Sequence, residues 1–404
     1  MEPSDRARLH SGRSSMGILQ SESRGRGKCA ALGFLLEILA WCFCRKVESQ
    51  RARVDSDFCT DNDEIRCPDS RATWNTRTTI TIDVFKGKKG LPVELSAQLD
   101  EYWSNYKAKF NKTYSGAMED SRRNAWEENL VKIYEHNLLA AAGHHSYTLR
   151  DNHIADLSTR QYIRSMVKLV PSYKRRIVED EMVSMMLHHP NLAPAYLDWR
   201  EKGFVTPAEN QRNCGSCYAY SVAGSIQGQI FKQTGKLTPL SEQQLIDCSI
   251  SSGNLGCTGG SLRNTMKYLE RSKGLMAQEA YPYKGRQGAC KFQRDKSVVN
   301  ITSWAILPAR DEKALEAAVA TIGPIAASIN ASPKTFQLYH NGVYDDETCS
   351  SDMVNHAVLI VGYTPTEWIV KNWWGETWGE NGYMRIAKNK NRCGISNYAA
   401  YAKI

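Results

Sequence analysis

Three side chains that together could perform acyl transfer are spread over the second half of the chain. Cys217 lies in Gln211-Arg-Asn-Cys214-Gly-Ser-Cys217, directly before an apolar segment with helical character. Backbone N–H groups and the dipole at a helix N-terminus favour a thiolate over a thiol. A thiolate nucleophile also needs a proton acceptor and donor beside it. His356, which opens an apolar strand pattern, and Asn372, which follows the next one, are the candidates for that role and for orienting the imidazole.

The Cys214-x-x-Cys217 spacing also permits two other interpretations. A redox pair requires a thioredoxin-like βαβ setting, and a zinc site requires a second close pair of Cys or His ligands. The sequence around these cysteines has neither feature. We therefore expect a cysteine nucleophile at Cys217 and no metal site.

From about Ala193 to Ile404 the chain resembles the papain family of cysteine proteases, and within it the cathepsin L group. A cysteine signature with distant His and Asn partners is typical of this family. The motifs that carry the resemblance are Asp198-Trp-Arg-Glu-Lys-Gly, Gln211 to Cys217, Leu240-Ser-Glu-Gln-Gln-Leu-Ile-Asp-Cys248, Gly256-Cys257-Thr-Gly-Gly260, Tyr281-Pro-Tyr283 and the segments around His356 and Asn372.

The resemblance implies a role for each residue of the site. Cys217 attacks the peptide carbonyl, His356 forms an ion pair with it and later protonates the leaving amine, and Asn372 orients the ring. The Gln211 side chain and the Cys217 backbone N–H would stabilise the oxyanion, a type of contact worth a few kcal/mol. The product is a thioester acyl-enzyme that water hydrolyses. No metal or organic cofactor is implied.

The resemblance also implies a second-subsite pocket with Tyr398 as its floor. A bulky neutral floor favours small hydrophobic side chains and offers no carboxylate to an arginine. The chain lacks the long insertion typical of exopeptidase relatives, so we expect an endopeptidase. The implied lining residues are Gly259, Gly260, Ser261, Leu262, Ser328, Val354, Ala357, Trp378 and Tyr398.

Two residues beside the predicted catalytic pair depart from the family pattern. Tyr218 stands where Trp is usual, and Trp373 stands where Ser is common. These changes leave open a second hypothesis, a catalytically weak or silent relative that acts as a binding protein. The presence of Cys217, His356 and Asn372 together favours the enzyme.

The chain has 12 cysteines, more than a reducing compartment normally requires. Seven of them follow Ala193, so at least one of those must stay unpaired. Sequence alone does not fix the pairing. The resemblance implies Cys214–Cys257, Cys248–Cys290 and Cys349–Cys393, with Cys217 free. Cys59 and Cys67 are expected to form a local disulfide.

Residues 97–160 resemble the inhibitory propeptide of cathepsin L-type enzymes. Charged and apolar residues at helical spacing predict two amphipathic helices over 97–142. The propeptide motif residues are Arg122, Trp126, Asn129, Ile133 and Asn137, followed by Asn152-His-Ile154-Ala-Asp156. A zymogen is implied, with the propeptide as an intramolecular inhibitor. Residues 161–192 are expected to be a linker with cleavage near Pro190–Ala195. The alternative interpretation of residues 97–160 is a helical hairpin with a role other than inhibition.

Residues 1–44 are interpreted as a signal or leader region. The apolar run 29–44 follows basic residues and is short for a membrane-spanning helix, so a cleaved signal is favoured over an uncleaved anchor. The start at Met1 or Met16 stays open. Residues 45–96 are expected to be an extended leader of unknown role. The secretory route implies a lysosomal or extracellular protein, with sequons at Asn111, Asn300 and Asn330.

The chain composition fits a globular protein of two or three folded units. Its 404 residues are 42% hydrophobic and 24% charged, and the net charge is +9 without a long basic run. These values exclude a disordered, collagenous or polytopic membrane protein and give no support for nucleic-acid binding. Expected partners are peptide or protein substrates, the chain's own propeptide and, by resemblance, cystatin-like inhibitors.

Helices and strands around the candidate residues predict an α+β fold. Helical patterns cover 217–233, 241–247, 261–272 and 311–321, and strand patterns cover 325–330, 356–363, 368–371 and 383–387. The resemblance implies the two-domain papain-like architecture over 193–404. A helical left domain would carry Cys217 and a β-barrel-like right domain would carry His356 and Asn372, with the cleft between them.

Overall fold

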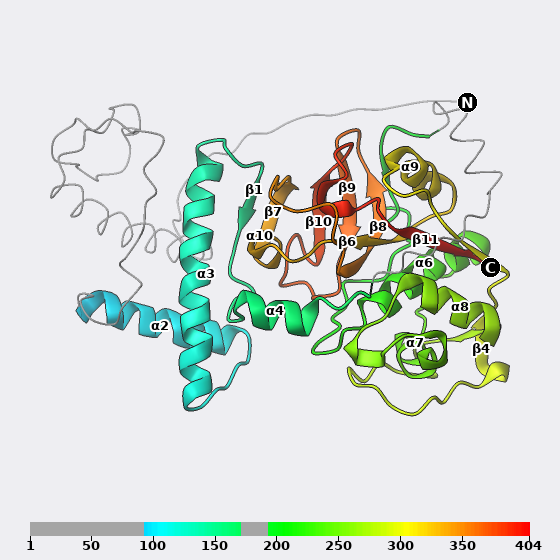
Figure 1. Cartoon of the computed structure of the whole chain (residues 1–404), viewed down its shortest axis with the longest axis horizontal. Helices are drawn as coiled ribbons and strands as arrows, with labels where there is room; N and C mark the ends of the chain where they lie inside the picture. Colours follow the sequence, from blue (N-terminus) through cyan, green and yellow to red (C-terminus); the bar gives the residue numbers. More distant parts are fainter. Residues whose placement is uncertain (1–92, 171–192) are drawn as a thin grey trace, which may run out of the picture. The chain divides into compact units, whose positions relative to one another are not determined.

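The computed structural model describes residues 93–170 and 193–404 (Figure 1). The predicted Cys59–Cys67 disulfide, the apolar run 29–44 and the cleavage region up to residue 192 lie outside the described residues. Helix α2 spans Val93–Lys109, so the extended leader predicted to reach residue 96 ends earlier. All elements discussed below belong to the compact unit Asn105–Ile404.

Helices come first and strands dominate the second half, which confirms the α+β prediction. The helices are α3 (Ala117–Ala141), α4 (Thr159–Met166), α6 (Cys217–Thr234), α7 (Glu242–Cys248), α8 (Leu262–Ser272), α9 (Glu312–Thr321) and α10 (Lys334–Gln337). The strands are β1 (Tyr147–Leu149), β2 (Leu197–Asp198), β3 (Leu275–Met276), β4 (Ser297–Val299), β5 (Ser303–Ile306), β6 (Ile325–Ile329), β7 (Tyr339–Tyr344), β8 (His356–Tyr363), β9 (Glu367–Lys371), β10 (Tyr383–Ala387) and β11 (Ala399–Lys403).

The main sheet positions the histidine and asparagine segments side by side. Its strand order is β1-β7-β10-β9-β8-β6-β11-β5, with β2 paired to β8. Leu359 of β8 pairs with Lys371 at the end of antiparallel β9, so the chain after Lys371 runs toward the start of β8. Among the described strands no pairing joins β1 to β5, so the barrel-like sheet is not closed.

Helix α6 is the core helix of the molecule. Every residue from Cys217 to Ile230 is buried, including the polar residues Ser221, Ser225, Gln227 and Gln229. Two glycines allow the helix to approach its neighbours closely. A β-carbon at Gly224 would lie 2.9 Å from a Leu359 methyl group of β8, and one at Gly228 would lie 2.6 Å from Pro324. The close contact fixes the helix that begins at Cys217 against the strand that begins at His356.

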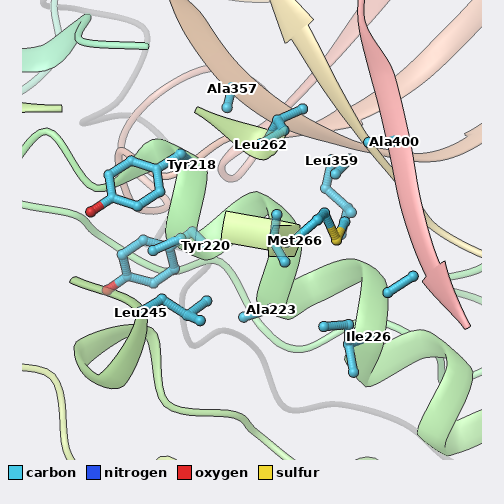
Figure 2. Close-up of a cluster of buried hydrophobic side chains, with 14 of the residues drawn as sticks. Tyr218, Tyr220, Ala223, Ile226, Leu245, Leu262, Met266, Ala357, Leu359 and Ala400 are labelled. Atoms are coloured by element: carbon cyan, nitrogen blue, oxygen red, sulfur yellow. The ribbon is translucent and has the colours of Figure 1, made fainter. Parts of the chain in front are cut away.

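Figure 2 shows the apolar cluster around this helix. Side chains of α6 meet residues of α7 and α8 and residues of the sheet, which joins the helical and β-rich halves in one core. The labelled members are Tyr218, Tyr220, Ala223, Ile226, Leu245, Leu262, Met266, Ala357, Leu359 and Ala400.

The predicted propeptide helices are present, and their motif residues bind the chain that follows. Asn129 donates to the carbonyl of Ala155 at 2.7 Å. Asn137 donates to the carbonyl of Leu149 at 2.9 Å and accepts from its N–H at 2.8 Å. Helix α4 extends to Met166, capped by Ser158, so residues 161–166 are helical and the linker prediction is wrong for them.

Candidate active site

Cys217 is the first residue of α6 and carries a free thiol. It is the unpaired cysteine of the described residues, and it is fully buried. Its neighbour Cys214 is bonded to Cys257, and the Gly215 N–H donates to the Cys257 carbonyl at 2.9 Å. These contacts hold the turn that presents the sulfur at the helix N-terminus.

His356 and Asn372 meet as the sequence predicts. His356 opens β8, Asn372 follows β9, and the His356 Nε2 atom lies 2.8 Å from the Asn372 Oδ1 atom. The Trp373 backbone N–H also donates to this Oδ1 at 2.8 Å. An oxygen that accepts this bond requires His356 Nε2 to be the donor, so the neutral ring carries its lone pair on Nδ1. Nδ1 is buried and has no hydrogen-bond partner among the described residues.

The sulfur of Cys217 lies against the start of β8. The backbone groups of Ala357, the residue after His356, and of Lys168 from the pro-segment lower the pKa of the Cys217 thiol. Burial nevertheless raises the pKa of Cys217 to about 11, and burial lowers the pKa of His356 to about 4 against the opposing effect of the Asn372 hydrogen bond. Burial thus disfavours both charged forms of the pair, and for Cys217 it opposes the effect of the helix N-terminus, which favours the thiolate.

Gln211 is fully buried beside the thiol. Its Nε2 donates to the carbonyl of Cys214 at 3.0 Å and to the carbonyl of Met166, at the end of α4, at 3.1 Å. The side chain that would bind an oxyanion is therefore engaged by a pro-segment carbonyl.

The pro-segment continues past the thiol along both walls. Leu169 donates its N–H to the Asn355 carbonyl at 2.7 Å, and Val170 donates to the Gly260 carbonyl at 2.8 Å. Leu169 forms a parallel bridge with Gly260. Gly259 has φ +134°, and a β-carbon there would lie 2.3 Å from the Lys168 carbonyl oxygen, so only glycine lets the segment pass so closely.

The comparisons with known proteins agree with this geometry. The sequence model described as the papain family cysteine protease matches residues 193–403, slightly more than half of the chain. This chain belongs to the papain family of cysteine proteases. The cathepsin propeptide inhibitor domain matches residues 103–162, so this papain-family protein is a zymogen with its inhibitor in the same chain.

Its relatives cover most of the chain. Cathepsin J of Mus musculus is 42% identical over 317 residues, covering 76% of this chain and 93% of the relative, and cathepsin K of Mus musculus is 41% identical over 312 residues, covering 76% and 94%. Among solved structures, digestive procathepsin L 3 from Tenebrio molitor larval midgut is 35% identical with a TM-score of 0.66, covering 76% of this chain and 99% of that structure.

The six other cysteines after Ala193 form the pairs that the papain-family resemblance implies. Cys248 is bonded to Cys290 and Cys349 to Cys393, in addition to the Cys214 bridge. Two bridges lie in the helical half and one in the β-rich half.

The structure distributes the predicted pocket residues between the two halves. Ser261 caps α8 and Leu262 begins it, while the Ser328 N–H donates to the Tyr398 carbonyl at 2.8 Å. Gly260, Ala357 and Ser328 are buried and Val354 is half-buried. Trp378 is fully buried, and its indole donates to the Phe336 carbonyl at 3.2 Å. The second-subsite assignment stays a prediction.

Sequence reasoning missed several residues that hold the pro-segment. Gln337 donates to the carbonyls of Ile154 and Leu157 at 2.8 and 3.0 Å. The Tyr162 hydroxyl donates to the Ala331 carbonyl at 2.5 Å, and its ring packs edge-on against Trp374. Neither Gln337 nor Tyr162 lies in a motif, so only their contacts in the fold identify them.

The sequons differ in accessibility. Asn111 and Asn300 are exposed. Asn330 is buried, its amide donates to the Ser350 carbonyl at 3.0 Å, and its oxygen accepts from the Ser332 N–H. The folded chain leaves no exposed amide on Asn330, which disfavours a glycan there, and glycosylation at the three sequons stays a prediction.

Neither a metal cluster nor a membrane-spanning helix occurs in residues 93–170 and 193–404. No three His, Cys, Asp or Glu side chains there are grouped as metal ligands. No helix there is long and apolar enough to cross a bilayer.

Proposed function

We propose that the chain is a cysteine endopeptidase of the cathepsin L group that cleaves peptide bonds through a thioester acyl-enzyme. The contact of 2.8 Å between His356 Nε2 and Asn372 Oδ1, beside a free thiol at the start of α6, carries the proposal. It leaves Nδ1 of the imidazole as the basic nitrogen for the thiol.

The reaction follows from these positions. Once the cleft is solvated, the thiol proton passes to His356 Nδ1 and the sulfur attacks the peptide carbonyl. Gln211 Nε2 and the Cys217 N–H bind the oxyanion. The C–N bond breaks as His356 protonates the amine, which leaves a thioester. Water, deprotonated by His356, hydrolyses the thioester and restores the thiol.

The second subsite would accept small hydrophobic side chains, because Tyr398 gives it a neutral floor. The relatives include cathepsins J and K and a procathepsin L, which supports a lysosomal or extracellular location and regulation by cystatin-like inhibitors. Acid would loosen the pro-segment by protonating carboxylates on which its polar contacts depend.

The competing hypothesis is a silent binding protein, and labelling with an epoxide thiol trap separates the two. The full chain is converted to its mature form by an added protease, then the trap is applied. We expect one label on Cys217, loss of peptidase activity, and faster hydrolysis of reporters with Leu than with Arg at the second subsite. The unconverted zymogen should label slowly, because its thiol is neutral and covered.

Cys217→Ala serves as the control and should take no label. A folded, converted chain that takes no label and cleaves no reporter would support the binding protein instead.

A further inference from the structure

Trp373 stands at a position where the papain family commonly has serine, and it is fully buried. Its indole Nε1 donates to the carbonyl of Ala357 at 2.9 Å. Ala357 directly follows His356, and its backbone lowers the pKa of the Cys217 thiol. The indole therefore holds the backbone of the residue that follows the histidine and acts on the thiol.

The backbone of Trp373 holds two further parts of the site. Its N–H donates to Asn372 Oδ1 at 2.8 Å, the same oxygen that accepts from His356. Its carbonyl accepts from the Gln211 N–H at 2.8 Å. A serine could keep both backbone bonds, so the indole is what this chain adds.

The ring extends these contacts to the helix of the nucleophile. Tyr220, one turn after Cys217 in α6, stacks on Trp373 with ring centroids 5.3 Å apart and an interplanar angle of 24°. The Lys371 ammonium lies 5.2 Å from the Trp373 ring centre and 3.0 Å from a Glu209 oxygen. A buried cation over an indole is an attractive contact, so the ring is held by both neighbours.

We propose that Trp373 is a positioning residue that fixes the helix carrying Cys217 relative to the strands carrying His356 and Asn372. The inference rests on the proposed function, because it presupposes the roles of those three residues. The nucleophile and its base come from different halves of the molecule, and a misplacement of about 1 Å between reacting groups can cost about 100-fold in rate. A tryptophan that only filled the core would contribute to stability alone.

The test compares Trp373→Phe with Trp368→Phe. Trp368 is equally buried, and its indole donates one hydrogen bond, to Glu312 at 2.7 Å, so both variants lose one such bond. For Trp373→Phe we expect kcat about tenfold lower, KM within twofold of wild type, and the acid limb of kcat/KM moved to higher pH as the thiolate–imidazolium pair weakens. Trp368→Phe should leave all three values near those of wild type.

All chains are expressed at full length and converted by the same added protease, so conversion does not depend on their own activity. Equal kcat, KM and acid limb for the two variants would overturn the inference. If Trp373→Phe does not fold, Tyr220→Leu removes the stack from the other side and is judged by the same measurements. An inactive, unlabelled wild type would instead refute the proposed function.

Discussion

At the scale of single residues, burial shifts the pKa of both predicted reacting groups. Cys217 and His356 are fully buried, which disfavours the thiolate and the imidazolium alike. The hydrogen bond from His356 to Asn372 opposes this effect on the imidazole only in part. In the same form Gln211 donates to the Met166 carbonyl of the pro-segment.

A second buried group gives a pH-dependent stability. Glu242, the first residue of α7, is almost fully buried, and Gln278 donates to its carboxyl oxygen at 3.3 Å. Its pKa is raised well above the usual value, first by burial and then by the nearby Glu209 carboxylate, against the effect of Lys371. The folded protein therefore keeps a proton on Glu242 that the unfolded chain releases above pH of about 4.3.

We predict that Glu242→Gln makes stability less sensitive to pH. A raised folded pKa contributes stability that is complete below the unfolded pKa and is lost as pH rises toward the folded pKa. The amide cannot ionise, so the Tm of the variant should rise relative to the Tm of the parent chain as pH increases from 4 to 7. Thermal unfolding in a Cys217→Ala background, which prevents self-digestion, measures this.

Parallel Tm curves for Glu242→Gln and the parent chain over this range would contradict the prediction. Glu279→Gln is a control for the loss of one carboxylate at an exposed position nearby in the sequence.

At the scale of elements, the pro-segment is held by strand pairing and by buried amides. β1 pairs antiparallel with β7, and the Arg150 N–H donates to the Leu338 carbonyl at 2.9 Å. The Asn152 side chain donates to the Gln337 backbone carbonyl at 2.9 Å. The Gln337 side-chain amide in turn donates to two backbone carbonyls of the pro-segment. The pro-segment thus extends the sheet of the peptidase before α4 leads it to the thiol.

We predict that Gln337→Met speeds conversion of the zymogen. The change keeps the side-chain length but removes two donors to buried carbonyls, each bond worth about 1 kcal/mol. Binding of the separated pro-segment to the mature enzyme should weaken about tenfold or more, since about 1.4 kcal/mol corresponds to tenfold. The inhibition constant of an added pro-segment and the rate of conversion at acid pH measure this.

Hydrolysis of a small reporter by mature Gln337→Met should match that of wild type. An unchanged inhibition constant would show that these bonds do not contribute to inhibition.

At the scale of the whole molecule, the reacting groups belong to two halves that share one core. Helix α6, which begins at Cys217, packs against the sheet, and its Ser221 hydroxyl donates to the Val358 carbonyl of β8 at 2.6 Å. The sequons of this molecule lie at its exposed surface except Asn330, which is enclosed beside the Cys349–Cys393 bridge.

We predict glycans on Asn111 and Asn300 and none on Asn330 when the chain passes through a secretory lumen. Asn300→Gln should make the mature protein migrate faster in gel electrophoresis, because it loses one glycan. Asn300 lies in the mature part of the chain and is exposed. Asn330→Gln should leave the mobility unchanged. A shift for Asn330→Gln would mean that the residue is modified before it is buried.

The sequence was sufficient for most features that depend on local pattern or on several motifs together. It predicted the helix at Cys217, the strand at His356 and the α+β class, because periodicity and helix ends are local properties. The papain-family resemblance added the cysteine pairs. The linker prediction from the sequence failed at residues 161–166, which belong to a helix that Ser158 caps.

The amino-acid sequence thus determined which side chains could perform the chemistry and which helices and strands bear them. The tertiary structure alone decided that burial raises the pKa of Cys217 and that the Met166 carbonyl accepts from Gln211. It also decided that Asn330 is enclosed and that the Trp373 indole reaches Ala357. Each of these depends on burial or on contact between segments far apart in the chain. Solvent exclusion and long-range contact arise only when the chain is packed, so local sequence patterns do not encode them.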